Sequence, residues 1–225
     1  MNTSLRPTTA WDASPGVVSD SDMVAATALW AAMATAFVVA SHGASLRVTF
    51  LPGVCAAYAL TVWLWRTKQP LPSARDLWPW YLTALAVQFI HFAEENATGF
   101  ATEFPELYGG APYPATTFTT FNMVSYAVFT AASIALWRLN TMKLLVPLLF
   151  FCVYGALGNA IAHSLWTIRA GGYFPGWVTS LAFWPLGLLI LHRLLGDRWQ
   201  RTAAFALSFG AILATPLVAY ATHLP

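Results

Sequence analysis

The stretch QFIHFAEEN, residues 88–96, places an imidazole and two carboxyl groups at the end of an otherwise apolar segment. His91 and Glu95 are four residues apart, so an α-helix brings them about one turn apart on the same face. Glu94 lies about 60° to one side of His91. In a membrane span each ionisable residue costs about 2.5–3.5 kcal/mol on the insertion scale. If this segment crosses a membrane, groups inside the helical bundle must therefore stabilise the three side chains.

The composition supports a membrane location for the whole chain. Of the 225 residues 58% are hydrophobic and 9% are charged, whereas about a quarter of the residues in soluble domains are charged. Seven apolar runs have the length of a membrane-spanning helix. They cover residues 23–41, 48–65, 78–98, 116–137, 142–168, 177–195 and 202–221. We therefore expect an all-α transmembrane bundle of about seven spans.

The domain organisation follows from the same pattern. Residues 1–22 are rich in Ser, Thr, Pro and Asp, which predicts a disordered cytoplasmic tail. The connections between the later runs are short, so residues 23–225 are expected to form a single transmembrane domain. The chain has no nucleotide-binding glycine loop, no nucleophile elbow and no basic nucleic-acid patch, so a nucleic-acid partner is not expected.

The Lys and Arg residues predict the orientation of the bundle. With seven spans, nine of them fall on one side and two on the other. The first side holds Arg6, Arg66, Lys68, Arg75, Arg138, Lys143, Arg193, Arg198 and Arg201, and the second holds Arg47 and Arg169. Since positive charge is enriched in cytoplasmic loops, the amino terminus is expected inside and the carboxyl terminus outside.

This orientation places the polar residues of three spans at one depth. His91, Glu94 and Glu95 fall in the outer half of the third span, and Asn122 falls in the outer half of the fourth. The fifth span carries Asn159 and His163, one turn apart, near its outer end. Because the agreement in depth was not used to draw the spans, it predicts a single polar site. Gln88 extends the stripe of His91, and Tyr173 can reach the site from the connection after the fifth span.

Two blocks of this sequence resemble a known family. His91-Phe-Ala-Glu94-Glu95 matches the signature of the HXXEE family of predicted bacterial membrane proteins. Asn159-Ala-Ile-Ala-His163, followed by Tyr173-Phe-Pro-Gly176, is similar to a second polar block of that family, and the similarity extends over about residues 77–195. The resemblance implies an integral protein of the bacterial cytoplasmic membrane. It implies no particular reaction, because the family carries no settled activity.

The first interpretation of the polar residues is a metal centre in a membrane enzyme. His91, Glu94, Glu95 and His163 offer nitrogen and carboxylate ligands that suit one divalent transition metal such as zinc, iron or manganese. Asn122 and Asn159 could orient these ligands. The substrate would be a membrane lipid or another apolar small molecule.

Three other interpretations need no transition metal. His91, Glu94 and Glu95 could act as acid and base in a lipid isomerase or cyclase. The same acids could carry the coupling ion of a proton- or ion-coupled transporter. A polar network could also simply hold the helices together.

The two neighbouring acids are expected to differ. They project about 100° apart from a helix, so Glu95 shares its face with His91 and Glu94 does not. A cation beside Glu95 would favour its charged form, whereas apolar surroundings would favour the neutral form of Glu94. The sequence therefore predicts that Glu94 keeps its proton at neutral pH.

The charge asymmetry gives a direct prediction of topology. Reporter fusions that are active only on one side of the membrane should place the amino terminus in the cytoplasm and the carboxyl terminus outside. Both ends on the same side would remove the seven-span arrangement, and with it the common depth of the polar residues.

Overall fold

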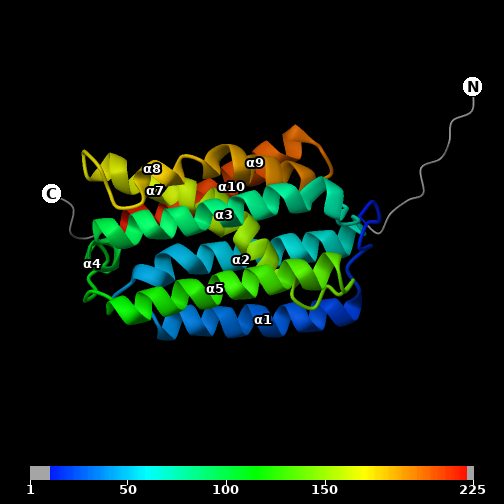
Figure 1. Ribbon diagram of the computed structural model, residues 1–225, viewed down its shortest axis with the longest axis horizontal. Helices are drawn as coiled ribbons and strands as arrows, with labels where there is room; N and C mark the ends of the chain where they lie inside the picture. The colour runs from blue at the N-terminus through cyan, green and yellow to red at the C-terminus, as the bar shows by residue number, and fades with distance from the viewer. Residues whose placement is uncertain (1–10, 222–225) are drawn as a thin grey trace, which may run out of the picture.

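The computed structural model describes residues 11–221, which fold into helices without a β-strand (Figure 1). The long outer helices are α1 (Asp20–Val39), α2 (Ser45–Thr67), α3 (Ala74–Thr98), α5 (Ala115–Trp137) and α10 (Trp199–Ala219). A continuous segment consists of α6 (Leu145–Phe150), a π-helix η1 (Phe151–Gly158) and α7 (Asn159–Arg169). The remaining helices are α4 (Phe100–Glu106), α8 (Trp177–Ser180) and α9 (Phe183–Leu194).

These helices confirm the predicted fold class. Six helical segments are long and apolar enough to cross a membrane, namely α1, α2, α5, the segment 145–169, the segment 177–194 and α10. The helix α3 has the length but a more polar composition, because it contains the stretch around His91. It lies alongside the others in the bundle (Figure 1) and completes seven membrane-length segments.

The segment 145–169 is the centre of the bundle. Most of its residues are buried, whereas few residues of α1 and α10 are. Its first part, α6, packs against α1, α2 and α5. The π-helix η1 packs against α2, α3 and α9, and α7 packs against α8, α9 and α10. A helix that is apolar all round is suited to such a central position, because every face must find an apolar partner.

Glycines allow two helices to approach the central segment closely. A Cβ atom added at Gly53 of α2 would lie 2.6 Å from Cβ of Tyr154, and one at Gly187 of α9 would lie 2.7 Å from the backbone nitrogen of Leu157. Small residues at helix contacts are typical of packing inside membranes. Tyr154 and Leu157 belong to the π-helix, which ends immediately before Asn159.

The sixth predicted span is interrupted, but not at its proline. The helices α8 and α9 are separated by residues 181–182. Pro185 lies in the first turn of α9 and has no N–H to donate to the carbonyl of Leu181, so the helical hydrogen bonding fails one turn before the proline. The predicted outer loop 99–115 also differs, since it contains the short helix α4.

Part of the predicted disordered tail is packed against the bundle. Trp11 stacks on Trp78 with 5.0 Å between the ring centroids, and Asp12 pairs with Arg75 at 2.8 Å. Ser19 caps the amino terminus of α1, which begins at Asp20. Residues 11–22 therefore make defined contacts with the bundle, and residues 1–10 lie outside the described part of the chain.

Candidate functional site

Polar side chains gather at the end of the bundle where α3 and α7 finish. The helix α4 and the connection 170–176 lie at this same end (Figure 1). The last turns of α3 supply His91 and Glu95, and α7 supplies His163. The common depth expected from the sequence is therefore present in the fold.

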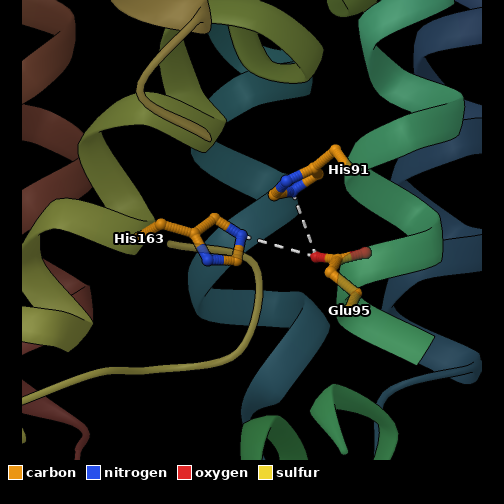
Figure 2. A group of neighbouring side chains, drawn as sticks. All are labelled: His91, Glu95 and His163. Atoms are coloured by element: carbon orange, nitrogen blue, oxygen red, sulfur yellow. Dashed lines mark ion pairs between the residues drawn. The ribbon is translucent and has the colours of Figure 1, made fainter. Parts of the chain in front are cut away.

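The two histidines converge on one carboxylate oxygen (Figure 2). His91 Nε2 lies 3.3 Å and His163 Nε2 lies 3.4 Å from Glu95 Oε1. The imidazole rings are nearly perpendicular, with 4.7 Å between their centroids. All three side chains are buried, with at most 7% of any one exposed. One ligand atom from each lies within 4.8 Å of the others, a spacing that could hold a metal ion.

Thr179 determines which nitrogen of His91 carries a proton. Its hydroxyl donates to a carboxylate oxygen of Glu94, so its oxygen is left to accept from His91 Nδ1 at 2.9 Å. In the neutral imidazole the proton is then on Nδ1, and Nε2 presents a lone pair towards Glu95. Among the described residues, Nε2 of His91 and Nε2 of His163 have no hydrogen-bond partner. His91 Nε2 and Glu95 Oε1 thus both present lone pairs, whereas no neighbour sets the tautomer of His163, because both of its ring nitrogens lack a partner.

Glu94 points to a different set of partners. It accepts hydrogen bonds from the Tyr173 hydroxyl at 2.7 Å, from the Val178 N–H at 3.0 Å and from the Thr179 N–H at 2.8 Å, besides the Thr179 hydroxyl. Glu94 is thus not part of the His–Glu–His group of this structure, and its predicted role as a metal ligand stays a prediction. Hydrogen-bond donors surround its carboxylate, so the apolar surroundings expected for Glu94 from the sequence are not what the structure shows.

Tyr173 lies in the connection between α7 and α8 and holds that connection to α3. Partial burial, with the Glu94 carboxylate as a further cause, raises the pKa of the Tyr173 hydroxyl. The phenol therefore keeps its proton and donates it to Glu94. The predicted supporting role of Tyr173 takes the form of this bond to Glu94, and the bond ties the connection to the last turn of α3.

Gly176 covers the group from the same connection. Its φ of +84° is in the left-handed region that favours glycine. A Cβ atom at this position would lie 2.6 Å from His163 Cε1, 2.9 Å from His91 Cε1 and 3.0 Å from Glu95 Cγ. The backbone of the connection therefore rests directly on all three side chains.

A chain of hydrogen bonds leads away from the group along α3, α5 and α7. Asn159 donates to the Gln88 side chain at 3.2 Å, and Gln88 donates to the Tyr126 hydroxyl at 3.3 Å. Tyr126 donates to Asn122 at 3.1 Å. The supporting residues Gln88, Asn122 and Asn159 are thus brought together, with Tyr126 as the link between them.

This chain forms part of the wall of a cavity of about 510 Å³. Glu95 also lines the cavity, so one member of the His–Glu–His group is accessible from it. Most other lining residues are apolar and come from α1, α2, α4, α5 and the central segment. The volume lies within the range of about 300–1,000 Å³ that is typical of small-molecule sites.

Sequence reasoning missed two residues that organise the site. Thr179 links Glu94 to His91, but a single hydroxyl at the start of an apolar segment gives no signal by itself. Gly176 belongs to the block Tyr173–Gly176, which was noted only for its resemblance to a family. Its positive φ and its contact with the histidines supply the physical reason for glycine there.

Comparison with known proteins agrees with that resemblance. Residues 80–190 match the model of a family described as "Protein of unknown function with HXXEE motif". No curated protein and no solved structure matches the chain. The matched residues include His91, Glu94, Glu95, His163 and Gly176.

The bonds of Glu94 predict the effect of removing its charge. In Glu94→Gln an amide group replaces one carboxylate oxygen and cannot accept from a backbone N–H. The amide of Val178 or of Thr179, whichever loses its acceptor oxygen, should then exchange its hydrogen about ten-fold faster, since a hydrogen bond to a charged group stabilises by about 1.5–3 kcal/mol. Glu103→Gln, at an exposed acid of α4, is the control. Equal exchange rates in the two variants would contradict this role of Glu94.

The contacts of Gly176 predict a second effect. Gly176→Ala should lower the thermal stability more than Gly171→Ala, by about 1–3 kcal/mol, because the methyl group must displace buried rings. Gly171 is the matched control, since it also has positive φ, at +62°, and has no atom within 4 Å of an added Cβ. Unfolding followed in detergent would measure both. A similar loss in the two variants would mean that backbone strain alone, and not contact with the histidines, requires Gly176.

Proposed function

Since residues 80–190 form a domain of the HXXEE family, we propose that the domain holds a metal centre in a membrane enzyme for a lipid or another apolar substrate. The ligands are His91, Glu95 and His163. The metal is one divalent transition ion, with zinc, iron and manganese compatible with this donor set. The enzyme acts in the outer half of a bacterial cytoplasmic membrane.

The observation that carries this proposal is the pair of Nε2 atoms beside a carboxylate. His91 presents an Nε2 lone pair, because its Nδ1–H donates a hydrogen bond to the Thr179 hydroxyl oxygen. His163 Nε2 and Glu95 Oε1 lie beside it, and both Nε2 atoms lack hydrogen-bond partners among the described residues. Buried polar atoms normally have partners, so two unpartnered nitrogens beside a carboxylate oxygen favour a positive group that all three share. A metal cation satisfies all three together.

The number and type of ligands support a reactive centre. Structural zinc sites have four protein ligands, whereas catalytic sites keep a position for water or substrate beside three. Two histidines and one carboxylate occur in zinc hydrolases and in non-haem iron oxygenases. A metal bound here would supply Lewis acidity or an activated oxygen ligand.

The surrounding residues hold the ligands and exclude water. Thr179 accepts the Nδ1 proton of His91, and Glu94 fixes Thr179 through two of its four hydrogen bonds. Partners of this kind orient the histidines of metal centres. Glu94 is therefore a positioning residue, and Gly176 closes the side of the group that faces the connection. Glu95 reaches the apolar cavity, which is where an apolar substrate would meet the centre.

Metal content provides the test. Purified protein should contain about one equivalent of a transition metal, and His91→Ala and His163→Ala should each lose most of it. Thr179→Val should keep the site but weaken the affinity about 10- to 100-fold, as expected for loss of a group that orients a ligand.

His192→Ala is the matched control. His192 is also a buried histidine of a membrane-length segment, but it lies near the opposite end of the bundle. The His192→Ala variant should therefore contain as much metal as the unmodified protein. If metal-free protein were fully active, the position shared by His91, Glu95 and His163 would hold a proton instead of a metal. His91 and Glu95 would then act as an acid–base pair.

A further inference from the structure

The cavity beside Glu95 has one wall that the HXXEE domain does not provide. Besides α3, α4, α5 and the central segment, it is lined by two residues of α2 and by residues of α1 that include Leu29, Met33 and Phe37. The helix α1 precedes the matched residues 80–190. The shape of the cavity therefore depends on a part of the chain outside the family match.

The cavity opens sideways between α1 and α5. The lining residues Val124 and Val128 of α5 are 58% and 39% exposed, and Ala36 of α1 is exposed as well. The helix α1 packs against α2 and α6, while α5 packs against α3 and α6. The exposed lining residues belong to membrane-length helices, so the opening faces the lipid and not the aqueous phase.

The inner end of the cavity offers hydrogen-bond acceptors. Glu95 Oε1 is directed at the histidines, and its second carboxylate oxygen points away from both (Figure 2). Among the described residues no donor is bonded to that second oxygen or to the side-chain oxygen of Asn159. Both residues line the cavity. A ligand head that donates a hydrogen bond would satisfy either atom.

The charges of the lining limit the kind of head group. Glu95 is the one charged residue among the lining residues, and no Lys or Arg is present. An anionic head, such as a phosphate or carboxylate, would lack a cationic side chain and would face the charge of Glu95. A cationic head would compete with the proposed metal for the same carboxylate. A neutral hydroxyl has neither penalty and provides the donor.

We infer that the cavity binds a single-chain lipid alcohol. Its hydroxyl lies beside Glu95 and Asn159, and its tail passes between α1 and α5 into the membrane. The volume of about 510 Å³ suits one chain and not a two-chain phospholipid. This inference names the substrate class of the proposed enzyme. It rests on the proposed function only for the position at which the hydroxyl head group reacts.

Photocrosslinking tests the position of the tail. Hexadecanol with a diazirine in its tail is added to the purified protein, and the labelled peptides are identified by mass spectrometry. Labelling should fall on α1 and α5 around Met33 and Val124. Val124→Trp should reduce it about ten-fold, because the indole fills the opening. Ile212→Trp is the matched control, since Ile212 of α10 is 59% exposed and lies away from the cavity. Equal labelling in both variants would overturn the inference.

Competition tests the head. Unlabelled hexadecanol should displace the probe at least ten-fold better than hexadecyl methyl ether, which has no donor, and better than the corresponding fatty acid or amine. If the ether, the acid or the amine competes equally well, the head is not a hydroxyl and the inference is wrong.

Chelation separates this inference from the metal proposal. Labelling by the alcohol probe should persist after the metal is removed, because the tail and the hydrogen bonds do not depend on it. Alcohol binding in a protein that never holds metal would support this inference alone. A bound metal without alcohol labelling would support the metal centre and overturn this inference.

Discussion

A carboxylate inside a helical membrane bundle requires a positive group beside it, and Glu95 lies against two imidazoles with which it could share one. This requirement explains why α3 and α7 must meet at a fixed height. His91 is on the same helix as Glu95, so the helical period aligns these two without any tertiary contact. His163 must be brought from the central segment, and burial of that segment on all sides holds it in place. The position of one charged group thus depends on the packing of the whole bundle.

The sequence was sufficient for those features that depend on hydropathy and helical spacing. The long helices begin and end within a few residues of the predicted spans, because the apolar runs are bounded by polar connections. The pairing of His91 with Glu95 and the common depth of His163, Asn159 and Asn122 followed from the same spacing. These properties depend on residues that are close together in the chain, so a single sequence is enough to predict them.

Features that depend on tertiary contacts were not predictable in this way. The direction of Glu94 is set by donors from residues 173–179, whose position relative to α3 no periodicity reveals. The ordered segment 11–19 is held by Trp78 and Arg75, although its composition resembles that of a disordered tail. The cavity likewise arises because α1 and α5 pack on other helices instead of filling the space between themselves. Each of these outcomes follows from where distant segments lie.

The connection that carries Tyr173 and Gly176 also has a consequence for biogenesis. Glu94 and Glu95 enter the membrane with α3, well before the ribosome has produced the partners at residues 163–179. Both acids occupy the last turn of that helix, next to the bundle end, so they can remain hydrated at the membrane surface while synthesis continues. The group becomes dry only when the connection has folded over it. Completion of the site therefore depends on insertion of the later helices, and a chain truncated before residue 163 would keep only the His91–Glu95 pair of the group.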